Sequence, residues 1–193
     1  IFSFFLNRNY IQNVDGNWGN LANSLRSLHL AENSITEISY YHDQKKNNIS
    51  FTSTKRHSSA EQFFNNQQTF KNFPKLTKLV WLDLSSNRIQ HISANSLPKS
   101  LVTLDLSKNL LTSFPQIQDH LHDLRILYLK DNLIQNLNDI SFKGLRSSLE
   151  KVDFSYNNIE QLPHRLFNES TRVNAINFDS NFITNVPANA FNG

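Results

Sequence analysis

The chain repeats one short frame from its first residue almost to its last. Residues 101–114 read LxxLxLxxNxLxxF, where x is any residue, and the frame recurs at 1–14, 25–38, 79–92, 124–137, 149–162 and 173–186. Its ninth position holds an asparagine each time, at Asn9, Asn33, Asn87, Asn109, Asn132, Asn157 and Asn181. Successive asparagines are 24, 54, 22, 23, 25 and 24 residues apart. Self-similarity at this period predicts a solenoid.

Each position of the frame has a physical task. Leu104 and Leu106 alternate around Asp105, which predicts a short strand with one buried side, so each repeat adds a strand to a parallel sheet. Asn109 follows where the chain bends out of the strand and backbone groups lose their partners. A buried amide donates and accepts at once, so stacked asparagines can satisfy the backbone of neighbouring repeats. We therefore expect the seven asparagines to form a structural ladder rather than an active site.

The long step in the period indicates an insertion. Residues around 41–70 do not fit the frame, and they are rich in Asn, Gln, Ser and Lys, which predicts a protruding, poorly ordered loop. The rest fits one array of about seven repeats, so we expect residues 1–193 to form a single domain. Residue 1 already fills a frame position and the polar caps of a solenoid are missing, so we expect an internal piece of a longer array.

The second half of each repeat indicates its class. Proline follows the frame, at the fifteenth position of the repeat, at Pro115, Pro163 and Pro187. Phenylalanine occupies the nineteenth position at Phe142, Phe167 and Phe191, with Phe73 at the equivalent place and Leu97 as a substitute. Stacked phenylalanines would fill the core below the convex side. With a period near 24, this pattern is similar to the extracellular class of leucine-rich repeat proteins. Within that class the chain resembles the chaoptin-like and Toll-type ectodomains of arthropods.

The resemblance implies a fold and a range of functions. The expected fold is an α/β leucine-rich repeat solenoid, with a parallel concave sheet and short 3-10 or loop segments on the convex side. The expected function is an extracellular scaffold that binds a protein partner, or a second copy of itself, in cell-surface adhesion or recognition. The alternatives are a ligand-binding fragment of a Toll-type signalling receptor and a structural matrix protein. Membrane attachment would come only from parts of the chain outside this sequence.

Composition argues against several other functions. The chain has no cysteine, which excludes thiol chemistry and zinc–thiolate clusters. Its net charge of +3 is mild, so it gives no indication of nucleic-acid binding. The four glycines form no phosphate-binding arrangement. We therefore predict a non-enzymatic protein without cofactors.

Two groups of polar residues could carry chemistry. Asp83 and Asp105 occupy the same outward position on adjacent strands, so their carboxylates should lie about 5 Å apart. Such a pair could share a proton or hold a cation, but Asp153 repeats the position, which favours a structural or solvated role. The segment from Asp119 to Asp123 includes His120 and His122 and is expected in a loop on the solvent side. Zinc needs three or four ligands in tetrahedral geometry, and we predict no metal site here.

The outward side chains of the strands are the predicted binding surface. Aromatic and charged side chains on an open sheet are typical of protein interfaces. The candidates are Trp81, Asp83, Asp105, Ile126, Tyr128, Lys130 and Tyr156. N-glycosylation sequons begin at Asn48, in the inserted segment, and at Asn168, on the expected convex side, and both would leave the strand face bare. The alternative is that these residues are merely the exposed side of a scaffold whose contact lies elsewhere.

Overall fold

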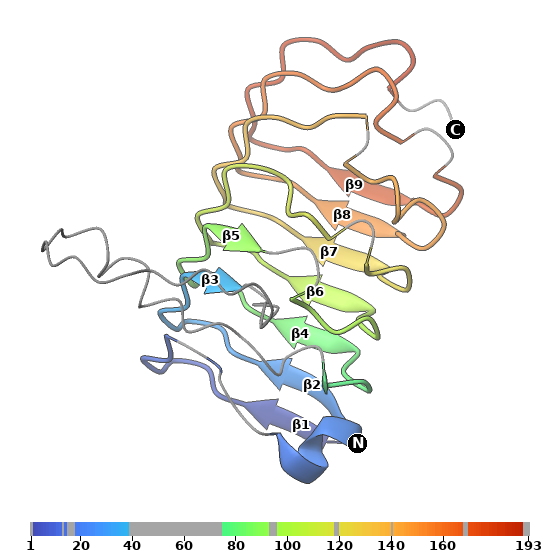
Figure 1. Ribbon diagram of the computed structural model, residues 1–193. Helices are drawn as coiled ribbons and strands as arrows, with labels where there is room; N and C mark the ends of the chain where they lie inside the picture. Colours follow the sequence, from blue (N-terminus) through green and yellow to red (C-terminus); the bar gives the residue numbers. More distant parts are fainter. Residues whose placement is uncertain are drawn as a thin grey trace, which may run out of the picture.

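The computed structural model describes residues 2–12, 14, 18–38, 75–92, 96–117, 120–139, 141–167 and 170–190. Seven parallel strands, one from each repeat, form a sheet in the order β1-β2-β4-β6-β7-β8-β9 (Figure 1). Their bounds are β1 Phe2–Phe5, β2 Leu25–His29, β4 Trp81–Asp83, β6 Thr103–Asp105, β7 Ile126–Tyr128, β8 Lys151–Asp153 and β9 Ala175–Asn177. The predicted leucine-rich repeat solenoid is confirmed.

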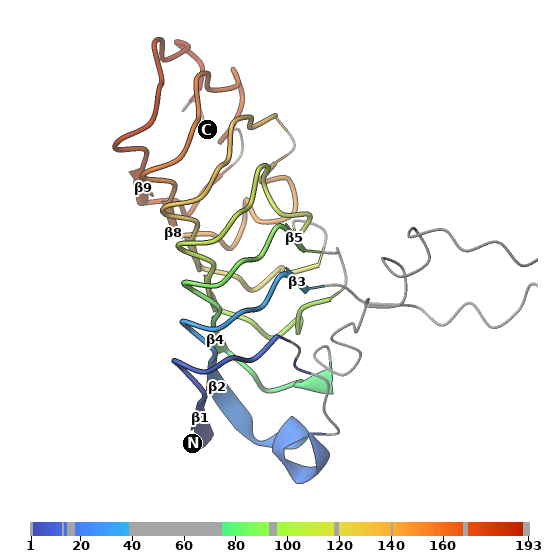
Figure 2. The same ribbon diagram turned by 90° about the vertical axis from the view of Figure 1, so that its left-hand side faces the viewer.

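Loops and turns cover the side of the array opposite the sheet (Figure 2). The described ranges include one complete 3-10 helix, η1, Gly19–Asn23, and Lys75 also has a 3-10 conformation. A second, two-stranded parallel sheet pairs β3, Glu37–Ile38, with β5, His91–Ile92. The sequence did not predict this small sheet. It forms because the ends of consecutive frames run extended side by side, and Ser113 and Asn136 make a similar isolated bridge.

The frame leucines form one continuous core between the sheet and the loops. Leu101, Leu104 and Leu106 are fully buried, as are their equivalents in the neighbouring repeats. Toward the C-terminal half, phenylalanine rings fill the space below the convex side. Phe142 and Phe167 stack with ring centroids 5.0 Å apart, and Phe114 meets Phe142 edge-on at 4.9 Å. The described Phe142 and Phe167 thus lie in the core, whereas Phe73 and Phe191 lie outside the described residues.

The ninth-position asparagines connect each repeat to the one before it. The Nδ2 of Asn109 donates to the carbonyls of Leu106 in its own repeat and Leu84 in the preceding repeat, both at 3.0 Å. Its Oδ1 accepts the backbone N–H of Ile89 at 2.9 Å. The same pattern holds at Asn33, Asn87, Asn132, Asn157 and Asn181. Asn9 is exposed and donates to Leu6 and Asn7 of its own repeat.

The residue before each of these asparagines has a left-handed backbone. Its φ lies between 54° and 58° at Arg8, Glu32, Ser86, Lys108, Asp131, Tyr156 and Ser180. Such a conformation is uncommon for residues other than glycine. It turns the chain sharply out of the strand, which brings the following asparagine inward under the carbonyls that it binds.

The repeats on either side of the long step stack directly. Strand β2 pairs with β4 in register, Ser27 opposite Trp81. Asn87 donates to the carbonyl of Leu30 at 2.9 Å and accepts the N–H of Ile35 at 3.0 Å, as other ladder asparagines do. The predicted inserted loop around residues 41–70 lies outside the described residues.

Candidate binding surface on the sheet

Two rows of side chains project outward from the sheet, because the strands pair in one register. One row contains Trp81, Thr103, Ile126 and Lys151, and the other contains His29, Asp83, Asp105, Tyr128 and Asp153. The intervening Leu82, Leu104, Leu127 and Val152 are fully buried. The predicted residues on strands β4, β6 and β7 therefore share one surface.

An aromatic run crosses the first strands of this surface. Phe5 of β1 stacks on His29 of β2, with ring centroids 4.5 Å apart and an interplanar angle of 13°. His29 in turn contacts Trp81 of β4 at 5.4 Å. Phe5 is 65% exposed and Trp81 is 49% exposed. Sequence reasoning missed Phe5 and His29, although both occupy the frame position of Asp83 and could have been found there.

The carboxylates of this surface organise the turns that follow the strands. Asp83 Oδ1 accepts the N–H of Ser85 at 3.0 Å, and Asp105 Oδ1 accepts that of Ser107 at 2.8 Å. Burial raises the pKa of Asp105, and the nearby charges of Asp83 and Asp153 raise it further, while the bonds from Ser107 oppose the shift. Asp83 Oδ2 also lies 3.7 Å from Nδ1 of His29. These carboxylates have partners within the protein, and no group of three potential metal ligands occurs among the described residues.

Two lysine–tyrosine pairs continue the surface toward the C-terminal strands. Lys151 Nζ lies 5.2 Å from the ring centroid of Tyr128, and Lys130 Nζ lies 5.1 Å from that of Tyr156. Tyr128 is half-buried on β7, whereas Tyr156 is 55% exposed in the turn after β8. The expectation that Tyr156 and Lys130 lie on the strands is thus corrected. The strands last only three residues, and both side chains belong to the turns at the rim of the sheet.

The histidine-containing segment before β7 differs from the prediction. His120 is 8% exposed rather than on the solvent side. Its Nε2–H donates to the carbonyl of Leu97 at 2.7 Å, so it connects two repeats below the surface. Burial lowers the pKa of His120, and Lys99 and His122 lower it further, although the bond to Leu97 opposes the shift. His122 is exposed and Asp119 lies outside the described residues, as do the sequon asparagines Asn48 and Asn168.

No helix in the described parts of the chain is long and apolar enough to cross a membrane.

Comparison with known proteins identifies the repeat. The family model described as leucine rich repeat matches residues 77–134. Lumican of Rattus norvegicus is 37% identical over 123 residues, 63% of this chain and 35% of lumican. Podocan of Mus musculus is 29% identical over 164 residues, 83% of this chain and 25% of podocan. Immunoglobulin domain and leucine-rich repeat-containing protein 2 of Caenorhabditis elegans is 45% identical over 78 residues, 40% of this chain and 10% of that protein.

The chain therefore spans only part of each of these relatives. The likeness nevertheless agrees with the architecture, since the matched region 77–134 contains three successive strands of the parallel sheet, β4, β6 and β7. The repeat match, the relatives and the solenoid together support a leucine-rich repeat family for this chain.

Proposed function

We propose that this chain is an extracellular scaffold that binds a protein partner through the outward face of its seven-stranded sheet, in cell-surface adhesion or recognition. The observation that carries the proposal is the aromatic run of Phe5, His29 and Trp81, in which Phe5 and Trp81 are exposed on either side of the largely buried His29. Large aromatic side chains contribute most of the binding energy in many protein interfaces. Here they project from the sheet, while the frame leucines fill the opposite side.

The surroundings of the aromatic run suit an interface. Asp83 and Asp105 lie beside Trp81, and the pairs Lys151–Tyr128 and Lys130–Tyr156 follow along the sheet. An aromatic centre with charged groups around it is typical of the core and rim of a protein interface. The partner is another protein or a second copy of this chain.

Alanine variants test the proposal. Trp81→Ala should weaken binding by about 2 kcal/mol, roughly thirtyfold in Kd, as expected for an interface anchor. Thermal stability should change little, because Trp81 contacts solvent and the ring of His29 rather than the core. Phe182→Ala is the matched control, since Phe182 is also exposed, at 64%, but follows a ladder asparagine outside the strands. Binding is measured with the purified chain on beads, by bead aggregation for self-association and by attachment to cells for other partners.

A glycan can block the same surface. The single change Asp105→Asn creates a sequon together with Leu106 and Ser107 in the middle of the sheet, and the resulting glycan should abolish both aggregation and attachment. Combining Asp105→Asn with Ser107→Ala removes the same charge without a glycan and should retain binding. Leu110→Asn places a glycan beyond the turn, in the segment that leads away from the sheet, and should also retain it. Unchanged binding by the chain glycosylated at residue 105 would exclude this face.

A further inference from the structure

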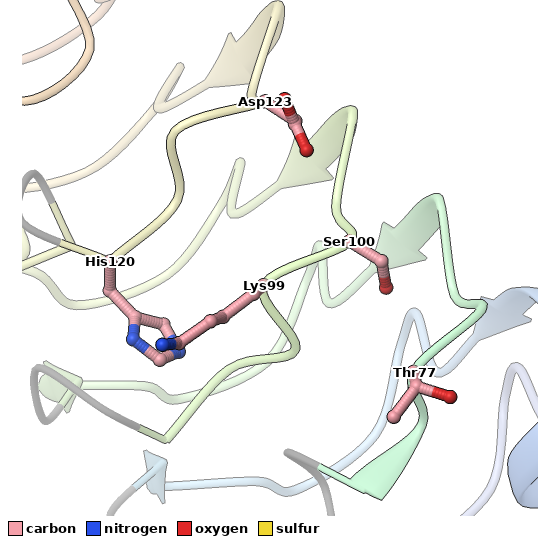
Figure 3. Close-up of a pocket in the computed structure, with 5 residues that line it drawn as sticks. All are labelled: Thr77, Lys99, Ser100, His120 and Asp123. Carbon is pink, nitrogen blue, oxygen red and sulfur yellow. The ribbon is translucent and has the colours of Figure 1, made fainter.

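A second surface lies on the flank where the chain enters the strands. One hollow of about 380 Å³ is lined by Thr77, Lys99, Ser100, His120 and Asp123. Figure 3 shows Thr77, Ser100 and Asp123 on the segments that lead into successive strands, with the side chains of Lys99 and His120 beside them. A second hollow of about 540 Å³ includes Ser100, His122, Asp123, Arg125, Ser147 and Arg172. Because the hollows share Ser100 and Asp123, we treat them as one flank groove.

The repeat frame explains why polar residues gather in this groove. The residue directly before the first frame leucine or valine is Lys78, Ser100, Asp123, Ser148 or Arg172 in five successive repeats. These residues precede strands that pair in one register, so they form a column with a spacing of about 5 Å. The column lies at the edge of the apolar core and therefore accepts any polar side chain. The groove is a consequence of the stacking and needs no special loop.

The flank groove carries basic groups with unused hydrogen-bonding capacity. Arg172 and Lys99 are exposed, and neither forms an ion pair with any residue that the structure describes. Arg125 is 52% exposed and lies 3.5 Å from Glu150. The carboxylate of Asp123 lies in the same groove, between the two hollows. This flank thus differs from the outward sheet face, where Asp83, Asp105 and Asp153 occupy one row.

The mixture of groups favours one chemical class of ligand. Guanidinium groups bind sulfate or carboxylate through paired N–H donors. Asp123 offers acceptors that suit hydroxyl groups and would repel a ligand that is anionic throughout. The Ser100 hydroxyl donates to the carbonyl of Leu79 at 2.7 Å, so its oxygen is also left as an acceptor for a hydroxyl. A ligand that alternates anionic and hydroxyl groups satisfies both, and the groove volume lies in the range of ligand sites.

We propose that the flank groove binds an acidic saccharide, with sulfate or carboxylate groups on Arg125, Arg172 and Lys99 and sugar hydroxyls on Asp123. The site is separate from the proposed protein-binding face, since none of these side chains projects from the outward rows of the sheet. Because the residues of the groove come from successive repeats, one saccharide chain can contact several repeats at once.

Calorimetry with the whole chain at physiological salt tests this proposal. A heparin hexasaccharide and a hyaluronan hexasaccharide distinguish sulfate from carboxylate as the recognised anion, and polyglutamate represents an acidic peptide. At least one saccharide should bind, and the double variant Lys99→Gln/Arg172→Gln should weaken that binding at least tenfold. Lys108→Gln is the control, because Lys108 is exposed in the turn after β6 and away from the groove. Its effect should stay below twofold.

The variant Asp123→Ala distinguishes specific saccharide recognition from nonspecific electrostatic attraction of a polyanion. Attraction to any polyanion would become stronger when this carboxylate is removed, whereas saccharide recognition should become at least threefold weaker. The proposal fails if neither saccharide binds, if polyglutamate binds as tightly, if Lys108→Gln causes an equal loss, or if Asp123→Ala tightens binding. Trp81→Ala should leave saccharide affinity unchanged, so a failure of the protein-binding proposal is distinguishable from a failure of this one. Circular dichroism melts verify that each variant is folded.

Discussion

Replacing Asn109 by leucine should destabilise the solenoid, and the expected loss follows from the hydrogen bonds that the Asn109 side chain makes. The carbonyls of Leu84, Leu106 and Ser107 lose the Asn109 amide, but each keeps another donor: Asn87, Asn132 and the N–H of Ser86, respectively. The N–H of Ile89 has the Oδ1 of Asn109 as its partner, and Ile89 is fully buried. One orphaned buried donor costs about 1–3 kcal/mol.

The assay is thermal unfolding of the chain, followed by circular dichroism. For a domain of this size a loss of 1 kcal/mol lowers Tm by about 2–4 °C, so the expected change is easily measured. Asn9→Leu is the matched control, because Asn9 is exposed and donates within its own repeat. It should cost less than about 0.5 kcal/mol, as surface substitutions usually do. Equal losses at Asn9 and Asn109 would refute the assignment of the ladder as a buried inter-repeat network.

Two further predictions concern the turns and the buried histidine. Lys108 has φ of 55°, so Lys108→Gly should stabilise the chain by up to about 1 kcal/mol and Lys108→Ile should destabilise it, as measured by thermal melts. Burial lowers the pKa of His120 below its ordinary value of 6.5, so the unfolded chain binds the proton more readily. The free energy of unfolding should therefore contain the full contribution of His120 above pH 6.5 and should decrease as the pH falls below that value. His120→Gln, which can still donate to the carbonyl of Leu97, should make the stability depend less on pH in this range.

The fold was predictable because each frame position has one chemical requirement. Leu104 must be apolar to fill the core, and Asn109 must both donate and accept hydrogen bonds. The residue type at each position therefore indicates whether the side chain is buried and what it contacts. The direct pairing of β2 with β4 followed from the same logic, since the frame resumes in register at Leu79. The small sheet of β3 and β5 was not predictable, because the ends of the frames carry no strict alternation.

The candidate surface was only partly predictable. Outward positions of the sheet face solvent, which places little restriction on residue type. The sequence therefore assigned Trp81 to this face, but it did not predict the contact between Trp81 and His29. That contact joins two residues on either side of the long step in the period. Tyr156 was assigned to the strand face, but the left-handed turn that contains it depends on backbone geometry rather than on side-chain type. The burial of His120 was missed because the segments that close the repeats vary in length and have no fixed register.

The direct stacking of β2 on β4 has a consequence for how this array can change in length. Elsewhere in the chain, neighbouring ladder asparagines are 22 to 25 residues apart, whereas here they are 54 apart. Loop-closure entropy grows only with the logarithm of chain length, so the extra residues cost roughly 0.7 kcal/mol when the two repeats come together. The pairing of β2 with β4 should therefore form late during folding, yet the long connection should lower the stability of the folded array very little. A solenoid built in this way can acquire a new segment at a repeat junction while the strands on both sides keep their register.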